Sequence, residues 1–564
     1  MIHHVEVQVL VILLIASVVG IAARRLQQPY TLALVLAGLA LSFVELETLK
    51  DVALTPELLL LLFLPPLLFE AAYHLPLEDV RKNLVHILFL AVFGVVVGVG
   101  LAAALAYGLI HSTGLAPEFN WAHAFLFAAT LAATDPISVL ALFKEIGAPK
   151  RLYQIVEGES LINDGVAVVI FSIVGTVIGL PLAHGGGGGH AELHGAQDIA
   201  VFAIIAFVKT GFGGLLIGAA IGGLASVTTR SIDDHLIEIT LTTLVAWGSF
   251  LVAEELGASG VLSTVAAGVV MGSFGSRYGM SASTRIAVVD FWEYMGFVSN
   301  SFIFLLVGLE LEPSVLFADA GVVVVGFVVL LIARSTLVYF GIPIVDRFTA
   351  PLPRSWRHVL VWGGLRGSLS MVLILGIPME FPGRHLLVNL VFGVVAISLF
   401  LQGLTMGPLM RKLGVQGGKG LAMTQEYELA RGRALAYRQV VNEADRLKEE
   451  GLIDAATYDR LRGWYAEHHE HAQQKARDLA GDTARPEWLL EGAKTLATIE
   501  KEALDHAVRA GVISENAGAE MLDQLDRRLD GLDRASHESE KALLEAFADL
   551  YRSPSEAVDE EPAT

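Results

Sequence analysis

The stretch YQIVEGESLINDGVAVVIFSIVGTVIGL, residues 153–180, decides the fold. At about 1.5 Å per residue it is long enough to cross a hydrocarbon core of about 30 Å as one helix. Its first half nevertheless carries a series of polar side chains, which includes those of Glu157, Glu159, Ser160, Asn163 and Asp164. Ionisable groups inside a membrane span are costly and by default mark an ion pathway. The segment therefore predicts a membrane-spanning helix with one polar, functional face.

The spacing of these side chains indicates what the face can bind. Ser160 and Asp164 are four residues apart, as are Glu159 and Asn163, so each pair shares a stripe of the helix. Hydroxyl and carboxylate oxygens suit alkali cations, whereas the sulfur and imidazole ligands that zinc and copper prefer are missing from this stretch. The alternative is a structural polar network that binds no ion.

The rest of the chain has the composition of a polytopic membrane protein. Of its 564 residues 54% are apolar and only 17% are charged, whereas about a quarter are charged in soluble domains. The apolar runs predict an all-α fold of about thirteen transmembrane helices, at residues 7–24, 31–47, 56–73, 84–110, 121–145, 153–180, 198–228, 234–255, 258–276, 287–311, 314–344, 355–379 and 386–410. No cleavable signal peptide is evident, so we expect the first run to be retained.

Charged residues predict the orientation and the domain boundaries. Most loop lysines and arginines fall on one side of the predicted membrane, which places the N-terminus outside and the C-terminus in the cytoplasm. We expect a plasma membrane of the bacterial inner-membrane type. From Val415 onward the chain has 31 acidic and 19 basic residues, which argues against nucleic-acid binding. The predicted regions are a transmembrane domain over 1–412, a cytoplasmic helical domain over 413–552 and a disordered C-terminus over 553–564.

Two further segments have recognisable patterns. In the tail, residues 443–461 resemble 504–525, because each has a helix that ends at a glycine and a new helix that begins after Asp454 or Ser514, both suitable N-caps. The loop at 184–194 combines three histidines with five consecutive glycines. It is either a flexible linker or a weak metal-binding or pH-sensing site. The chain has no cysteine, which excludes disulfides and thiolate metal sites.

Two of the predicted spans contain helix breakers. In 121–145, Pro136 follows Thr134 and Asp135, and its missing N–H should interrupt the helix there. Such a break lines a cavity or is buried in protein, and it frees carbonyl groups that could bind a cation. The alternative is a simple kink with Asp135 capping the second half. In 355–379, three glycines surround Arg366. The two spans cross in opposite directions, a pattern typical of inverted-repeat transporters.

Buried charges need partners, which leads to further predictions. The depths in the membrane that the sequence predicts would by themselves pair Arg366 with Asp164. The long side chain of an arginine can, however, reach outward by about one helical turn, toward the depth of Glu159. We predict a pair between Glu159 and Arg366, which leaves Asp164 free to bind ions. Glu70 either extends the ion pathway or sits near the cytoplasmic end of its span. Arg334 and Asn300 are expected to brace helices rather than to bind ions.

Four motifs together are similar to those of one transporter family. They are FLPPLLFEA (63–71), ATDP (133–136), GESLINDG (158–165) and GGLRG (363–367). The chain resembles the sodium/proton antiporters of the NhaP and eukaryotic exchanger type from about Val7 to Met410. This resemblance implies thirteen spans in a lipid bilayer, a homodimer, and an elevator-like alternation of a core domain against a dimer domain. The implied protein is a transporter without cofactors, not an enzyme.

The resemblance also implies roles for individual residues. Asp164 would be the central carboxylate for cation and proton, with Thr134, Asp135 and Ser160 as ligands or close neighbours. The remaining motif residues would brace the site or line its pathway: Glu159, Asn163, Arg366 and Glu70. An asparagine before Asp164, rather than a second aspartate, is similar to the electroneutral branch, which exchanges one cation for one proton.

Several alternatives stay open at this point. The ion could be Na⁺, Li⁺ or K⁺, because selectivity depends on cavity size and on the number of ligands. A K⁺-selective antiporter or channel of the same fold is one alternative, and a transporter-like sensor that signals through the tail is another. The tail could dimerise, sense pH or bind a regulator.

Overall fold

The computed structural model describes residues 2–26, 30–43, 59–180, 195–230, 232, 234–276, 279–310, 319–415, 419–449, 453–480, 514, 517 and 521. These residues form helices and their connections, without a strand among them. The histidine- and glycine-rich loop at 184–194, most of the repeat at 504–525 and the C-terminal segment at 553–564 lie outside the described residues.

The chain divides into two compact units, Met1–Gly417 and Gly418–Thr564. Among the described residues, the α-helices of the first unit are α1 (Ile2–Leu26), α2 (Tyr30–Ser42), α5 (Leu64–His74), α6 (Leu77–Leu88), α7 (Gly94–Thr113), α8 (Trp121–Thr130), α9 (Ile137–Ile146), α10 (Lys150–Val177), α11 (Ala196–Thr229), α12 (His235–Glu255), α13 (Gly260–Val270), α15 (Ala282–Glu310), α17 (Ala320–Thr336), α18 (Ile342–Val345), α19 (Arg354–Trp362), α20 (Ser368–Leu375), α21 (Arg384–Ile397) and α22 (Gly403–Lys412). Five short π-helical turns join some of them: η1 (Leu59–Phe63), η2 (Phe89–Phe93), η3 (Met271–Gly275), η4 (Leu337–Gly341) and η5 (Ser398–Gln402).

Long apolar helices make the first unit a multi-pass membrane protein. Six helical segments among the described residues are long and apolar enough to cross a membrane: Val80–Thr113, Lys150–Val177, Gln197–Thr229, His235–Glu255, Ala320–Val345 and Arg384–Lys412. Shorter apolar helices occur at Val7–Ala23, Tyr30–Ser42, Leu61–His74 and Gly260–Gly275. All of these overlap predicted spans, while the total of thirteen stays a prediction.

The two interrupted helices are confirmed. The predicted span 121–145 consists of α8 and α9, which are separated by the non-helical residues 131–136. The predicted span 355–379 consists of α19 and α20, separated by residues 363–367. In each case the break falls on the proline or the glycines that the sequence places there, because these residues weaken the helical hydrogen-bond ladder.

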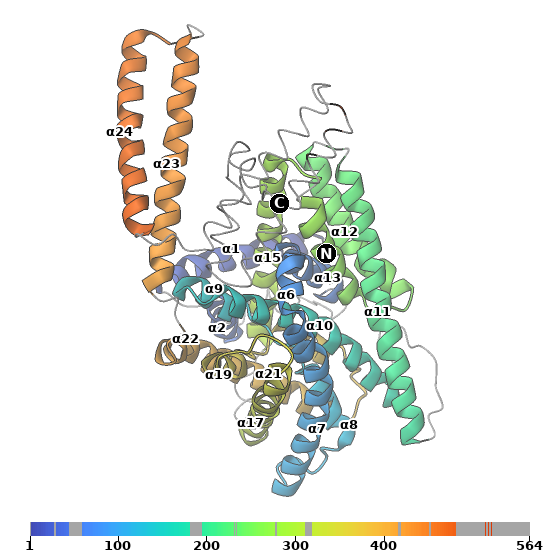
Figure 1. Cartoon of the computed structure of the whole chain (residues 1–564). Helices are drawn as coiled ribbons and strands as arrows, with labels where there is room; N and C mark the ends of the chain where they lie inside the picture. Colours follow the sequence, from blue (N-terminus) through green and yellow to red (C-terminus); the bar gives the residue numbers. More distant parts are fainter. Residues whose placement is uncertain are drawn as a thin grey trace, which may run out of the picture. The chain divides into compact units, whose positions relative to one another are not determined.

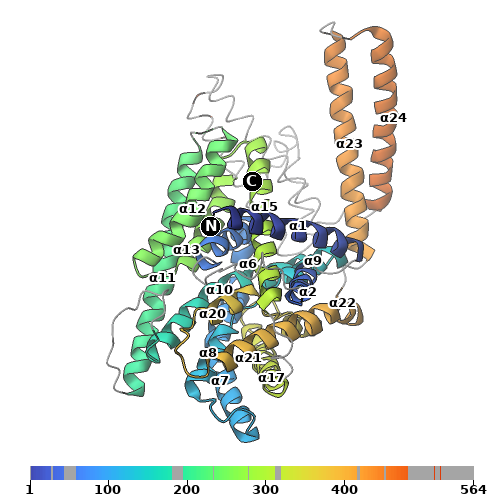
Figure 2. The same cartoon turned by 180° about the vertical axis from the view of Figure 1, so that it is seen from behind.

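Close packing holds α11 beside α13, and α12 beside both (Figures 1 and 2). A Cβ added to Gly218 of α11 would lie 1.9 Å from the carbonyl oxygen of Ser263. Small residues allow this approach, as in other membrane helix pairs. Large apolar side chains of α11, such as Leu216 and Leu224, are 69% and 72% exposed. An exposed apolar face of this kind suits contact with lipid tails.

The apolar core of the first unit has two parts. The larger cluster of buried side chains draws on helices from α1 to α22 and surrounds the two helix breaks. The smaller cluster is centred on Trp292, which packs against Phe69 with ring centroids 4.5 Å apart. The indole N–H of Trp292 donates to Thr242 Oγ1 at 3.1 Å, so its polar atom is satisfied inside the cluster.

The described part of the second unit is a helical hairpin of α23 (Lys419–Glu449) and α24 (Ala455–Ala480), which pack along each other. Asp454 caps α24 as predicted, because its Oδ1 accepts the N–H groups of Ala456 and Thr457 at 3.0 Å each. Farther along, Ser514 Oγ accepts the N–H of Ala517 at 3.4 Å. Helical structure in this part of the tail was expected from its composition.

Candidate functional site

The two helix breaks meet each other. The N–H of Asp135, in the first break, donates to the carbonyl oxygen of Leu365, in the second, at 2.8 Å. A Cβ added to Gly367 would lie 2.2 Å from both Cβ and Oδ2 of Asp135. Asp135 Oδ1 also accepts the N–H of Ile137, the first residue of α9, at 3.0 Å. Each break thus satisfies backbone groups of the other, which non-helical backbone at membrane depth requires.

Arg366 is held by backbone carbonyl groups. Its Nη1 donates to the carbonyl oxygens of Ala132 and Ala133, each at 3.0 Å. These carbonyls follow the C-terminal end of α8, where the helix dipole presents partial negative charge to a cation. The N–H of Arg366 donates to Ser398 Oγ, in the π-helical turn η5, at 3.1 Å. The freed carbonyl groups that were expected to bind a cation therefore bind a guanidinium.

The predicted pair between Glu159 and Arg366 is wrong. Both carboxylate oxygens of Glu159 accept from Arg334, which lies on α17, and the Nη2–Oε2 distance is 2.9 Å. Arg334 also donates to the carbonyl oxygen of Leu360, near the end of α19, from Nε at 3.2 Å and from Nη2 at 3.1 Å. The prediction that Arg334 braces helices is confirmed. It connects α10, α17 and the first half of the second broken helix.

The polar stripe of α10 contacts the first break directly. Asn163 Nδ2 donates to Thr134 Oγ1 at 2.6 Å, and Asn163 Oδ1 accepts the N–H of Thr134 at 3.3 Å. One turn earlier, Ser160 Oγ donates to the carbonyl oxygen of Thr134. The structural polar network that the sequence left open as an alternative is thus present. It coexists with side-chain oxygens that retain free lone pairs.

A cavity of about 520 Å³ adjoins this network. Asp164, Asp135, Thr134, Ser160 and Glu70 all line it. Within the part of the chain that the structure describes, Asp164 makes no hydrogen bond or ion pair with protein. Asp164 is partly buried, and carboxylates that are shielded from water usually have such partners. The cavity therefore presents the uncommitted carboxylate of Asp164 beside the hydroxyl groups of Thr134 and Ser160, which suits a small hard cation or a proton.

The other three predicted site residues lie behind this wall. Glu159, Asn163 and Arg366 do not line the cavity. Asn163 and Arg366 instead border a much smaller space together with Arg334. The structure thus separates five residues that face the cavity from three that support them.

Sequence reasoning missed several polar residues of the cavity wall. His74, Lys144 and Glu293 line the cavity in addition to the predicted residues, as does Glu157, which the sequence had placed on the polar face of α10. His74 Nδ1 lies 3.5 Å from Glu70 Oε1. Lys144 and Glu293 are charged residues inside predicted spans, so they carried a signal that could have identified them. No regular spacing in the sequence relates Lys144 or Glu293 to Asp164, so the sequence did not indicate that they share a cavity.

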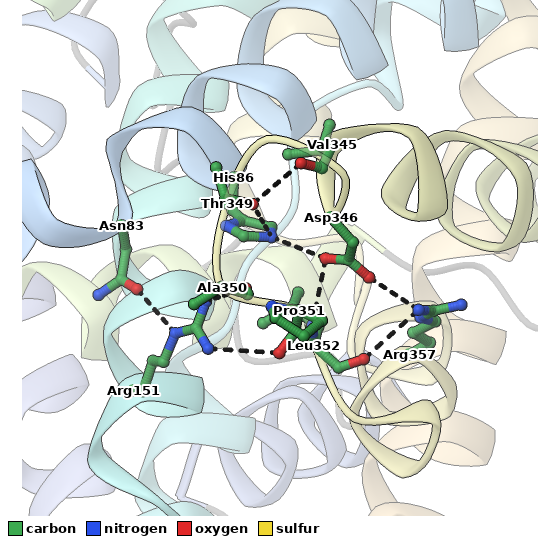
Figure 3. A network of polar contacts seen from close by, with 10 residues as sticks. All are labelled: Asn83, His86, Arg151, Val345, Asp346, Thr349, Ala350, Pro351, Leu352 and Arg357. Carbon is green, nitrogen blue, oxygen red and sulfur yellow. Dashed lines mark hydrogen bonds and ion pairs between the residues drawn. The ribbon is translucent and has the colours of Figure 1, made fainter. Parts of the chain in front are cut away.

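A second polar network lies away from the cavity, at the N-terminal end of α10 (Figure 3). At its centre is Asp346, which directly follows α18. Its carboxylate accepts from Arg357 Nη2 at 2.7 Å and from the N–H of Leu352 at 3.1 Å, and its Oδ1 lies 3.1 Å from His86 Nε2. These contacts connect α6 to the loop that precedes α19.

Arg151 extends the same network to α10 (Figure 3). It donates to the carbonyl oxygen of Ala350 at 2.7 Å and to Asn83 Oδ1 at 3.1 Å. Asn83 in turn donates to Gln154 Oε1 at 3.2 Å. None of these residues lines the cavity. The network therefore serves as a frame that fixes the start of the helix bearing Asp164.

The sequence of this chain is similar to those of known proteins. Residues 10–412 match the family model described as sodium/hydrogen exchanger, transmembrane. The chain is 40% identical to the Na(+)/H(+) antiporter ApNhaP of Aphanothece halophytica, over 75% of this chain and 76% of that protein. It is 37% identical to the Na(+)/H(+) antiporter NhaG of Bacillus atrophaeus, over 85% and 88%.

A solved structure has a similar fold. The sodium proton antiporter MjNhaP1 from Methanocaldococcus jannaschii superposes with a TM-score of 0.58. The superposition covers 73% of this chain and 99% of that one, at 17% sequence identity. At this identity the likeness concerns the fold.

Proposed function

Because the chain belongs to the sodium/hydrogen exchanger family, we propose that it is a secondary-active antiporter that exchanges Na⁺ for H⁺ at Asp164. The observation that carries the assignment is the carboxylate of Asp164, which lines the cavity and has no protein partner among the described residues. Proton and cation compete for this group, since each neutralises it. Binding of one therefore requires release of the other, which couples the two fluxes.

The charges around the helix crossing support exchange of one Na⁺ for one H⁺. Glu159 and Arg334 form an ion pair and cancel each other. Asp135 and Asp164 together contribute two negative charges when ionised, and Arg366 contributes one positive charge. At the crossing itself, leaving aside the charged residues on the rest of the cavity wall, the remainder is a single negative charge, which either one Na⁺ or one proton neutralises. Because one Na⁺ takes the place of one proton, the exchange is electroneutral.

Alternating access follows from the cost of moving charge. A site with a net charge is expensive to carry through a low-dielectric membrane, whereas a neutral one crosses more easily. The site loaded with Na⁺ or with H⁺ is neutral and can switch between opening to one side of the membrane and opening to the other. The empty, charged site makes this switch slowly. The crossed helix breaks move as one piece, because they share backbone hydrogen bonds.

The surroundings of the transporter are part of the proposal. We place the protein in the plasma membrane, with its N-terminus outside and its C-terminal unit in the cytoplasm, on the distribution of lysines and arginines between loops. It is proposed to act as a homodimer in the bilayer. Its transported ions are Na⁺, or another monovalent cation, and H⁺, and it needs no cofactor.

The test is Na⁺-dependent proton flux in proteoliposomes. Asp164→Asn should abolish the flux, because the amide cannot exchange a proton for a cation. Asp319→Asn is the matched control, since Asp319 accepts from Asn389 at 2.9 Å and does not line the cavity. Sustained exchange in Asp164→Asn would contradict the assignment.

The same vesicles test stoichiometry and ion selectivity. An electroneutral antiporter works at the same rate whether or not the membrane potential is clamped. A rate that changes with the clamp would rule out one-for-one exchange. Replacing Na⁺ by Li⁺ or K⁺ in the same assay establishes which monovalent cation is transported.

A further inference from the structure

One helix faces the helix crossing across the cavity. Glu293, Gly296, Phe297 and Asn300 of α15 all line the cavity that contains Asp164. Their spacing of three, one and three residues places them on a single face of the helix. A Cβ added to Gly296 would lie 3.4 Å from Glu70 Oε2, so this face also approaches the wall formed by α5. The cavity therefore has a second polar wall besides the α10 stripe.

Asn300 is the unexplained residue on this face. Its Oδ1 is buried and has no hydrogen-bond partner within the part of the chain that the structure describes. Most buried polar atoms have a partner, so each exception calls for an explanation. Asn300 was predicted to brace helices, and a brace should have such a contact. The structure does not support that role.

The neighbouring residue does brace the helix. Ser301 Oγ lies 2.7 Å from the hydroxyl oxygen of Tyr30, which connects α15 to α2. Tyr30 also stacks on Phe297, with ring centroids 5.1 Å apart. The contact between α15 and α2 is therefore made without Asn300. This leaves the amide of Asn300 available to the cavity.

We propose that Asn300 is a further ligand of the transported cation, supplied by the α15 wall of the cavity that Asp164 also lines. This inference rests on the proposed antiport at Asp164. An amide oxygen is a hard donor that suits an alkali cation, directly or through one water molecule. A half-turn of the amide group brings either of its polar atoms toward the cavity.

An amide at this position also fits the charge balance of the site. It adds a cation ligand without adding a charge, so the balance of charges at the helix crossing is unchanged. A proton on Asp164 needs no such ligand, because it is bound covalently. Asn300 therefore favours the cation over the proton and adjusts the competition between them.

The experiment measures Na⁺ dependence in proteoliposomes containing the full-length protein. Asn300→Ala should raise the half-saturating Na⁺ concentration by about tenfold, the size expected for one lost interaction with a charged group, and leave the maximal rate nearly unchanged. Heat protection of the purified protein by Na⁺ should move to higher Na⁺ concentration in parallel. Asn300→Asp preserves the size of the side chain and adds a charge, so its transport rate should become sensitive to membrane potential.

Ser299→Ala is the matched control. Ser299 precedes Asn300 on the same helix, and its Oγ is likewise buried without a hydrogen-bond partner among the described residues, but it does not line the cavity. It should retain the parental Na⁺ dependence, and an equal shift in this control would overturn the proposal. Unchanged Na⁺ dependence in both Asn300 variants would also overturn it. Neither result affects the assignment of Asp164, which fails only if Asp164→Asn still exchanges ions.

Discussion

Two arginines, Arg366, which is buried, and Arg334, which is partly buried, support the site in different ways. Arg334 forms an ion pair with Glu159, whereas Arg366 is bound by the carbonyl oxygens of Ala132 and Ala133. Glu159 is only 2% exposed, so its charge depends on Arg334. Removing one partner of a buried pair leaves the other charge uncompensated, which is more harmful than removing both.

Arg334→Ala should therefore destabilise the protein by about 3–5 kcal/mol, seen as a lower melting temperature in detergent. Arg334→Lys should recover part of the loss, because it restores the charge but not the two-point contact. The double variant Glu159→Gln, Arg334→Met should be more stable than Arg334→Ala. If Glu159 coupled more strongly to Arg366 than to Arg334 in double-mutant cycles, the pairing would be incorrect.

Sequence reasoning identified the residues of the site better than their contacts. The spacing of Ser160, Asn163 and Asp164 correctly predicted one polar face of α10. The partner of Glu159 was predicted incorrectly, because arginine is long and the depth of Arg334 depends on uncertain helix ends. Pairing is a property of helix packing in three dimensions, and a single sequence carries little information about it.

At the scale of elements, the helix breaks are the best-predicted feature and the hairpin of the tail the next. Pro136 and the glycines of the second break act locally, through a missing N–H or backbone freedom, so sequence suffices to place them. The close contact between the two breaks could not be predicted in this way. It depends on the packing of Gly367 against Asp135, and no local sequence pattern indicates that these two residues meet.

Gly367→Ala should impair transport without unfolding the protein, because the new methyl group would collide with Asp135 and separate the two breaks. Gly364→Ala in the same break is the control, since its Cβ would have its nearest neighbour, Arg334 Nε, at an ordinary 3.5 Å. Proteoliposome flux of both variants measures the effect. Equal activity would show that the close approach at Gly367 is not required.

The tail hairpin should respond to acid through Asp445. Hydrogen bonds from the Tyr458 hydroxyl at 2.7 Å and Arg462 Nε at 2.9 Å hold the pKa of Asp445 below its ordinary value. The stabilisation is thus fully present above the pKa of an unfolded aspartate, about 3.9, and is lost as the pH falls through the lower folded pKa. The effect should be small, because the contact is exposed to solvent.

Amide hydrogen exchange of the intact protein tests this prediction. Asp445→Asn should exchange faster than the parent protein between residues 453 and 465 at neutral pH. The difference should shrink as the pH falls through the lowered folded pKa of Asp445, because the carboxyl group then loses its charge. A difference that persists in acid would mean that the carboxylate charge is not the cause.

At the scale of the whole molecule, the first unit contains the entire site and extends to Gly417. The predicted boundary at 412 falls inside this unit. Val415 lies beyond that boundary yet is 3% exposed in the apolar core, and its N–H donates to the carbonyl oxygen of Met410 at 3.0 Å. A boundary drawn where the apolar run ends therefore cuts off a buried residue.

A chain truncated after Gly417 should retain Na⁺-dependent proton flux, because every residue assigned to the site lies before that point. A chain truncated after Lys412 should be less stable by about 1.5–3 kcal/mol, the value of burying one such side chain. Flux assays and melting temperatures of the two truncations measure these effects. Loss of flux in the longer one would indicate that the tail takes part in transport itself.

Four carbonyl groups at the helix crossing, those of Ala132, Ala133, Thr134 and Leu365, are engaged by Arg366, Ser160 and the N–H of Asp135. A pore that strips water from ions with a ring of main-chain oxygens can change its preference only by rebuilding its backbone. In the proposed site the atoms that distinguish one ion from another belong to side chains. A change in a single codon can replace each of these side chains. Over evolutionary time, a lineage entering a saltier or more alkaline habitat could acquire a different ion preference by point substitutions while the crossed helices stay intact.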